Sequence, residues 1–93
     1  MFSKIPIDLK AIPPEDINKE ILRAAIATEL DAVNLYEQMA LMASDENIKK
    51  VFLNVAREEK THIGEFQAML LRTDEEQARE LDAGWDEVEE LIG

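Results

Sequence analysis

Cysteine is absent from the 93 residues of this chain, which excludes disulfides, thiolate metal sites and redox-active thiols. Histidine occurs only once, as His62. Any metal site in this sequence must therefore rely on carboxylates and on that single imidazole. The absence of cysteine does not by itself fix the cellular compartment.

Basic residues are also scarce, because 10 Lys and Arg face 21 Asp and Glu, for a formal net charge of −11. This excess argues against nucleic acid and anionic membrane surfaces as partners, and it suits the attraction of cations. Ordinary solvated acidic faces would give the same charge. No apolar run approaches membrane-spanning length, and residues 1–12 alternate apolar with charged side chains, unlike a signal peptide. We therefore predict a cytoplasmic protein.

The length predicts one small domain over residues 1–93, near the lower limit for a self-sufficient hydrophobic core. The pattern predicts an all-α fold with an N-terminal extension at 1–14, a first helix at 15–43, a second helix at 45–72, and short C-terminal helices within 74–92. Two long helices joined by a tight turn form an antiparallel hairpin. Because such helices leave apolar faces uncovered in so short a chain, we expect association.

Capping signals define these boundaries. The run from Pro13 to Asp16 places proline ahead of a first turn with two acids, and Ser44 is the predicted N-cap of the second helix. Thr73-x-x-Glu76 resembles a capping box that starts a third helix near 74–82, and Gly84 is predicted to end it. One side of the following tail is apolar and is expected to dock on the bundle or on a neighbouring subunit. That side consists of Trp85, Val88 and Ile92.

Each long helix carries one apolar seam whose residues are four and three apart in turn. The first seam consists of Leu22, Ile26, Glu29, Val33, Tyr36 and Ala40. The second seam consists of Ile48, Phe52, Val55, Glu59, His62, Phe66 and Met69. Neither seam contains Lys or Arg, so its carboxylates have no evident cationic partner. A divalent metal would remove the cost of burying them as unpaired charges.

Glu59 and His62 are three residues apart on one helix, about 60° in azimuth and about 4.5 Å in rise, so both can reach one small ion. Glu29 and Tyr36, seven residues apart, share one face of the other helix. Simpler explanations exist for each residue: a helical Glu-x-x-His recurs by chance, His62 suits a hydrogen-bonded core histidine, and Tyr36 suits packing. A non-catalytic helical adaptor that holds structural Zn²⁺ or Ca²⁺ would use the same acids.

One chain offers only half of a di-iron centre. Di-iron carboxylate bundles take a Glu from each of two helices and a Glu-x-x-His from each of the other two. Two copies of this hairpin related by a two-fold axis would supply Glu29, Glu59 and His62 twice, and their four carboxylates would balance two Fe²⁺ ions in formal charge. We therefore predict that homodimerisation completes a ferritin-like four-helix bundle and creates the site.

Residues 29–38 (ELDAVNLYEQ) and 57–62 (REEKTH) resemble the encapsulated ferritins, and the resemblance covers about residues 17–72. These short relatives of ferritin and rubrerythrin are carried inside encapsulin nanocompartments or fused to the shell protein. The resemblance implies that Glu29, Glu59 and His62 are ferroxidase ligands shared across a subunit interface, with Tyr36 assisting catalysis beside them. It also implies a di-iron centre that cycles between Fe²⁺ and Fe³⁺, dimers assembled into a ring, commonly a decamer, and a shell that stores the mineral.

The sequence departs from the family pattern near the predicted ligands. Asp31 corresponds to a family glutamate proposed to guide incoming iron, whereas Thr28 replaces a neighbouring acid and Leu35 stands where some members have Trp. The chain ends at Leu91-Ile92-Gly93 with no recognisable shell-targeting peptide. We therefore expect a shortened chain or the N-terminal domain of a longer fusion.

The predicted function is a ferroxidase that feeds iron storage in an encapsulin nanocompartment. A rubrerythrin-like peroxide reductase would use the same ligands, but this sequence has no cysteine for the rubredoxin-type electron donor that such enzymes usually carry. The helical adaptor is the remaining alternative.

Overall fold

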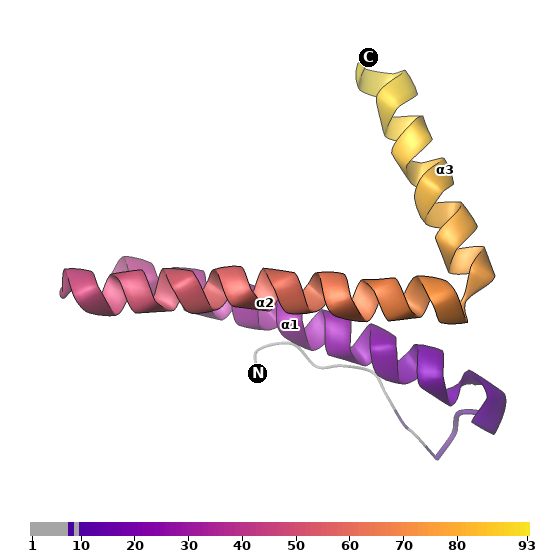
Figure 1. The fold of residues 1–93 in the computed structure, drawn as a ribbon, viewed down its shortest axis with the longest axis horizontal. Coiled ribbons are helices and arrows are strands. Elements are labelled where there is room, and N and C mark those ends of the chain that lie inside the picture. Colours follow the sequence, from indigo (N-terminus) through magenta and orange to yellow (C-terminus); the bar gives the residue numbers. More distant parts are fainter. Residues whose placement is uncertain (1–7, 9) are drawn as a thin grey trace.

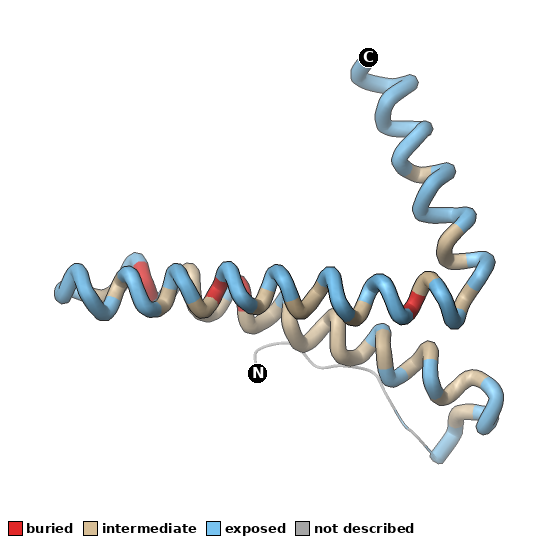
Figure 2. Tube along the Cα trace, viewed as in Figure 1, coloured by how far each residue is buried: buried red, intermediate tan, exposed pale blue. Residues whose placement is uncertain are grey.

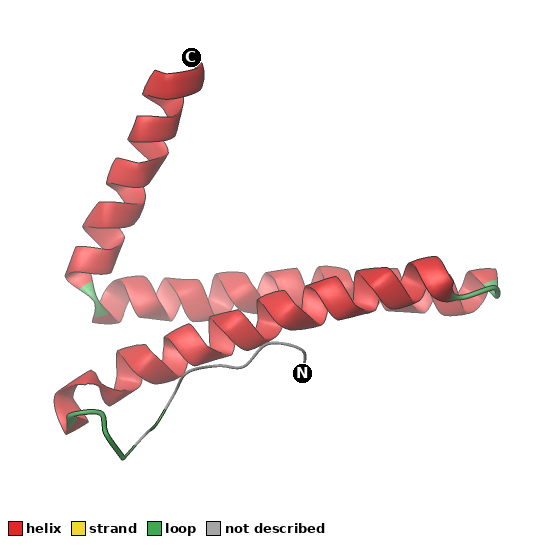
Figure 3. Ribbon diagram, turned by 180° about the vertical axis from the view of Figure 1, so that it is seen from behind, coloured by secondary structure: helices red, strands yellow, loops and turns green. Residues whose placement is uncertain are grey.

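The computed structural model of the protein describes residue 8 and residues 10–93. A 3-10 turn, η1 (Pro14–Asp16), leads into three helices: α1 (Ile17–Met42), α2 (Glu46–Thr73) and α3 (Glu75–Ile92). The long helices α1 and α2 lie side by side and antiparallel, and α3 leaves the end of this hairpin at a wide angle (Figures 1 and 3). The predicted all-α hairpin is confirmed. No strand occurs in the described residues. The predicted N-terminal extension at 1–14 falls mostly on residues 1–7 and 9, which lie outside the described residues.

The turn between α1 and α2 is fixed by an N-cap one residue later than predicted. Helix α1 ends as the Ala43 backbone N–H donates to the Met39 carbonyl oxygen, 3.0 Å away. The Asp45 carboxylate then accepts the backbone N–H groups of Asn47 and Ile48, at 2.8 and 3.0 Å. Ser44 is therefore not the cap, because Asp45 satisfies two of the free N–H groups that open α2.

A second carboxylate starts α3. Asp74 accepts the backbone N–H of Gln77 at 3.1 Å and the Arg23 guanidinium of α1 at 2.6 Å. Thr73, in contrast, is the last residue of α2, and its hydroxyl donates to the Met69 carbonyl at 2.8 Å. The predicted Thr73 capping box is therefore wrong. The Arg23–Asp74 ion pair ties the start of α1 to the corner between α2 and α3.

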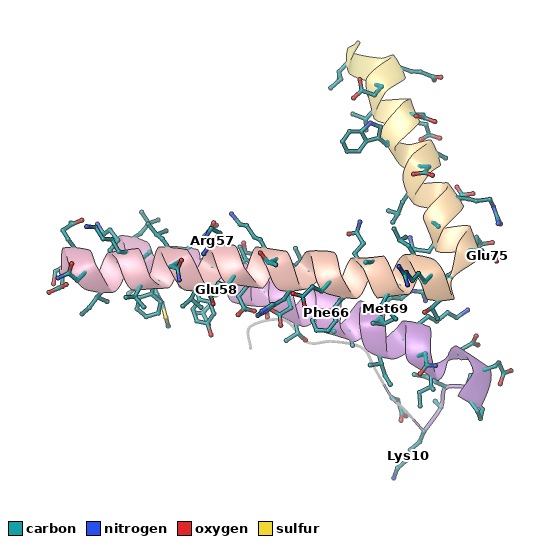
Figure 4. The ribbon with its side chains drawn as sticks, viewed as in Figure 1. Lys10, Arg57, Glu58, Phe66, Met69 and Glu75 are labelled. Carbon is teal, nitrogen blue, oxygen red and sulfur yellow. The ribbon has the colours of Figure 1, made fainter. Side chains whose placement is uncertain are left out.

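Helix α3 is continuous over residues 75–92 and does not end at Gly84. A glycine inside a helix costs about 1 kcal/mol relative to alanine, and the strong helix formers on either side outweigh that cost. The apolar side of α3 does not dock on the hairpin, since Trp85 remains 71% exposed. Figure 4 shows α3, from Glu75 onward, turning away from the two long helices, although Gln77 and Leu81 near its start still border a pocket with residues of α1 and α2.

The core between the helices is small. Only four described side chains are buried, namely Val33, Ala40, Ala56 and Leu70 (Figure 2). The first predicted seam is confirmed, because all its members are buried or half-buried. The second seam is wrong at its ends: Ile48 and Met69 are 51% and 52% exposed, while Ala56 and Leu70 are buried between the helices instead.

The chain is extended rather than compact. Its radius of gyration is 16.5 Å, whereas a compact domain of this length has about 12 Å. No helix in the described residues combines the length and apolar character needed to cross a bilayer. Large apolar side chains remain uncovered along both the hairpin and α3, so the single chain leaves surfaces available for other contacts.

The capping geometry predicts different outcomes at two adjacent residues. Asp45→Ala removes both N-cap hydrogen bonds and should lower the free energy of unfolding by roughly 1 kcal/mol. Ser44→Ala, the matched control, should change it by less than about 0.5 kcal/mol. Urea unfolding followed by circular dichroism measures both. An equal loss in the two variants would contradict the assignment of the cap.

The corner between α2 and α3 should be sensitive to acid. The pKa of the Asp74 carboxyl lies below its usual value, mainly because it accepts the Gln77 backbone N–H and because Lys19 and Arg23 lie nearby, although partial burial opposes this shift. A lowered folded-state pKa gives stability that is fully present above the unfolded value of about 3.9 and is lost as the pH falls through the folded-state pKa.

Asp74→Asn keeps the cap and removes the charge, so wild type should melt higher than the variant at pH 6 and at the same temperature near pH 2. Arg23→Gln should narrow the difference at pH 6. Thermal melts across this pH range test the prediction, and a difference independent of pH would refute it.

Candidate metal centre

Helices α1 and α2 bring three predicted ligands together near the middle of the hairpin. Glu29 comes from α1, and Glu59 and His62 come from α2. One potential ligand atom from each residue lies within 4.8 Å of the other two. The His62 Nδ1 atom is 3.6 Å from Glu29 Oε2 and 3.6 Å from Glu59 Oε2. Within the described residues, no other group of three acids, cysteines or histidines has this spacing.

The three side chains differ in exposure. Those of Glu29 and Glu59 are 19% and 17% exposed, whereas that of His62 is 43% exposed. The cluster is therefore closed on the side of the hairpin interior and open on the side of the imidazole. A small ion could approach from that open side without any movement of the helices.

The Glu29 carboxylate is incompletely satisfied. Its Oε2 atom is buried and accepts no hydrogen bond from any described residue. The contact with His62 Nδ1 at 3.6 Å is an ion-pair distance if the imidazole is protonated, but it is too long for a hydrogen bond. A buried carboxylate oxygen without a partner costs free energy, and coordination of a cation would remove that cost.

The cationic side chain next to the site does not supply this partner. Lys60 follows Glu59 directly, but its Nζ atom pairs with Glu37 Oε2 across the two helices at 3.1 Å, and both side chains are largely exposed. Sequence reasoning did not find this ion pair, because its members lie on different helices and no pattern within one helix reveals it. Among the described residues, the ion pairs of Glu29 and Glu59 are with His62 and not with Lys or Arg.

The donor set fits a divalent metal of intermediate softness. Carboxylate oxygen and imidazole nitrogen together suit Fe²⁺ and Zn²⁺, whereas Ca²⁺ prefers oxygen ligands alone. Three protein ligands also leave coordination positions on the ion free for further ligands. The unsatisfied Glu29 oxygen gives separate support for a bound cation, because it is an observation of the structure and not of the residue types alone.

Tyr36 lies seven residues, or about two helical turns, after Glu29 on α1, and it packs on an aromatic neighbour. Its ring centroid is 6.1 Å from that of Phe52, with an interplanar angle of 35°. Across the described residues, the Tyr36 hydroxyl forms no hydrogen bond with Glu29, Glu59 or His62. The catalytic role of Tyr36 stays a prediction. In the single chain, Tyr36 packs against Phe52, as the alternative interpretation of the sequence allowed.

The residues predicted near an iron-uptake route lie on α1. The Thr28 hydroxyl donates to the Ala24 carbonyl oxygen at 2.9 Å, so it is occupied within its own helix. Asp31 is half-buried. On α2, the exposed Glu58 side chain accepts the Asn54 side-chain amide at 2.8 Å. Although adjacent to Glu59, Glu58 belongs to the exposed polar face, as the sequence indicated.

Comparison with known proteins places this hairpin in the class of ferritin-like domains. A family model described as rubrerythrin matches residues 20–90. A ferritin-like-encapsulin shell fusion protein of Pyrococcus furiosus is 62% identical over 74 residues, or 80% of this chain. The crystal structure of the encapsulated ferritin domain from Pyrococcus furiosus matches 100% of this chain and 95% of its own, at 50% identity and a TM-score of 0.84.

The chain belongs to the encapsulated ferritins, within the rubrerythrin family, as the two sequence segments suggested. It spans about a fifth of the length of the curated fusion protein that it matches, since the shared region is 21% of that protein.

The unsatisfied carboxylate predicts a conflict between stability and metal binding. Glu29→Met keeps the side-chain length and removes the buried charge, so it should raise the free energy of unfolding of the metal-free protein by roughly 1–3 kcal/mol. The same variant should lose the stabilisation that Zn²⁺ or Fe²⁺ gives to wild type. Urea unfolding with chelator and with metal measures both effects.

Glu37→Gln is the matched control on the same helix, because it removes an exposed ion pair that contributes about 0–1 kcal/mol. It should leave the metal-dependent stabilisation unchanged. A Glu29→Met protein that is less stable than wild type in chelator would show that the carboxylate is already satisfied.

Proposed function

We propose that this protein is a ferroxidase that oxidises Fe²⁺ to Fe³⁺ at a di-iron site shared between two chains. The main support is the cluster of Glu29, Glu59 and His62, with its buried and unsatisfied Glu29 oxygen. Membership of the encapsulated ferritins supports an iron-related role for this cluster. The residues that bind the substrate iron are inferred from this chain's own geometry.

A second copy supplies the missing half of the site. The cluster is open where His62 is 43% exposed, and a two-fold axis on that side brings two such clusters face to face. Four helices then surround two ions held by four carboxylates and two imidazoles, the arrangement of di-iron bundles. The exposed apolar residues Ile48 and Met69, at the two ends of the predicted seam, become covered by the same association.

The protein residues bind and orient the substrate ions. Glu29 and Glu59 provide negative charge that attracts Fe²⁺, and their four copies balance two such ions in formal charge. His62 binds through the unprotonated nitrogen of its imidazole ring. In the assembled site, the Tyr36 hydroxyl donates a hydrogen bond to a ligand carboxylate and so fixes its orientation. Two Fe²⁺ ions give up one electron each, and O₂ takes these two electrons with two protons to form H₂O₂.

The oxidised iron passes to a store outside this chain. The matched fusion protein of Pyrococcus furiosus carries an encapsulin shell, which supports an encapsulin nanocompartment in the cytoplasm as the setting for this protein. In this proposal, dimers assemble into a ring, a decamer by analogy with the family, and the shell protein is the partner that holds the mineral. Storage of the mineral is assigned to the shell and not to this chain.

A peroxide reductase is the second candidate, because the matched family is described as rubrerythrin. It would use the same ligands with H₂O₂ as the preferred oxidant. The 93 residues contain no cysteine for a rubredoxin-type iron centre, so electrons would have to come from another protein. We therefore prefer the ferroxidase, in which Fe²⁺ is both substrate and electron donor.

The two adjacent glutamates of α2 provide a sharp test. Glu59→Gln and His62→Ala should lower the initial rate of Fe²⁺ oxidation in air by at least about 100-fold, because each removes a ligand from both halves of the site. Glu58→Gln should keep the wild-type rate, because its side chain is on the exposed face. Ferric absorbance and oxygen consumption, with about one iron per chain, are the measurements.

The same assay distinguishes the alternatives. Faster oxidation with H₂O₂ than with O₂ at equal concentrations would favour the peroxide reductase. Iron uptake without any oxidation would favour the non-catalytic adaptor. Wild-type rates in Glu59→Gln or His62→Ala would refute the assignment of the site.

A further inference from the structure

Helix α3 meets the hairpin near its own start, at a pocket of about 270 Å³ beside the corner. All three helices line this pocket, and the residues that matter here are Ile26, Leu30, Gln67, Leu70, Gln77 and Leu81. Helix α3 contributes Gln77 and Leu81, from its first two turns. Farther along α3, Trp85 and Val88 are 71% and 52% exposed. The hairpin thus holds α3 at one end and leaves the rest of it uncovered.

The apolar side chains of α3 lie on the side that begins at this pocket. Trp85, Val88 and Ile92 follow Leu81 by four, seven and eleven residues, the spacing of one helix face. Gly84 lies on that face too, because it lines a second pocket together with Leu81, Trp85 and Val88. We call these five residues the α3 stripe. Since α3 leans back over the hairpin (Figure 1), further rotation in that direction would bring the stripe onto α2.

The pocket sets a register for α2 against α3. Gln67 and Leu81 lie seven residues before and seven residues after Asp74, and both line the pocket. Leu70 and Gln77 line it as well, four residues before and three residues after Asp74. Two antiparallel helices have the same rise per residue, so positions equally far from the corner stay opposite each other along their length.

Two glycines inside helices come together in this register. Gly64 of α2 and Gly84 of α3 each lie ten residues from Asp74. Glycine weakens a helix interior, and a Cβ atom added at either position would meet nothing within 4 Å. The open chain therefore gives no packing reason for either residue. Facing glycines allow two helix backbones to approach closely, so one closed arrangement accounts for both of them.

The charges of α2 and α3 are complementary in the same register. Arg57 and Lys60 precede Gly64 by seven and four residues, so the three residues share one side of α2. Helix α3 carries eight acidic side chains and one arginine. The register brings Lys60 beside Glu87. Lys60 remains accessible for such a contact, because its side chain is 59% exposed while it pairs with Glu37 at 3.1 Å.

The corner at Asp74 holds α3 in the open position. Asp74 is the single residue between α2 and α3. Its carboxylate accepts the Gln77 backbone N–H at 3.1 Å and pairs with the Arg23 guanidinium at 2.6 Å. Closely packed antiparallel helices are usually joined by about two to five residues. Closing therefore requires the helix ends beside Asp74 to unwind, and the lost cap opposes the gain from burying the α3 stripe.

We propose that α3 has a second, closed position, in which the chain bends at Asp74 and the α3 stripe packs along α2 with Gly84 against Gly64. The closed chain covers its own apolar stripe, so it must open before α3 can contact another molecule. The metal cluster stays accessible, because Gly64 and His62 are two residues apart and lie about 160° apart around α2. Closing is a property of the single, metal-free chain.

Cysteine pairing tests the register, because the natural chain contains no cysteine. Gly64→Cys and Gly84→Cys are combined in one metal-free chain, diluted until sedimentation gives the mass of a single chain. A disulfide needs Cα atoms about 4.4–6.8 Å apart, so this pair should cross-link at least about tenfold faster than the control pair Glu65→Cys with Gly84→Cys. The two pairs close loops of nearly equal length, but Glu65 is rotated by about 100° around α2.

Equal rates for the two cysteine pairs would overturn the proposal, because an unfolded or open chain does not distinguish them. Cross-links found only between chains would overturn it as well.

Trp85 is the only tryptophan, so its fluorescence gives a second, independent measurement. In single wild-type chains its emission should lie at a shorter wavelength, and acrylamide should quench it less, than in Gly64→Leu, whose side chain blocks the approach of α3. Glu65→Leu is the matched control and should keep the wild-type spectrum. Asp74→Gly removes the cap and the ion pair, so it should shift the emission further to shorter wavelength.

Identical spectra of wild type and Gly64→Leu would overturn the closed position. A wild-type shift that disappears on dilution would also overturn it, because the shift would then report contact between chains.

Discussion

The antiparallel register of α1 and α2 is the constraint on which the carboxylate–histidine cluster depends. It places the buried Oε2 atom of Glu29, which accepts no hydrogen bond from the described residues, 3.6 Å from His62 Nδ1. The Asp45 cap and the short turn set that register. A slip of one residue would rotate a ligand by about 100° around its helix and separate it from the other two.

Much of this arrangement was predictable from the sequence, because helix periodicity is a local property. The spacing of Glu29 in one seam, and of Glu59 and His62 in the other, predicted three residues that the structure places within 4.8 Å. The hairpin and the approximate ends of its long helices were also predictable. These features follow from 3.6 residues per turn and from strong stop signals, neither of which needs knowledge of the partner helix.

The predictions that were wrong concern positions where neighbouring residues are similarly suited to the same structural role. Ser44 and Asp45 are both good N-caps, and only the backbone path selects Asp45. Leu70 is buried where Met69 was predicted, because adjacent positions on a helix both border a seam and the facing helix decides between them. Gly84 continues a helix because the helix formers on either side outweigh one unfavourable residue. The role of Tyr36 cannot be derived from one chain in any case, because its hydroxyl has no partner there among the ligands.

The four buried side chains of the hairpin, two of them alanines, have a consequence for the life of the protein in a cell. So small a core gives a solitary chain little resistance to unfolding, and any association adds stability in proportion to the logarithm of concentration. A chain without a partner therefore spends more of its time unfolded than an associated chain does. Because the unfolded chain is the form that proteases cleave, the lifetime of the protein should rise with its concentration.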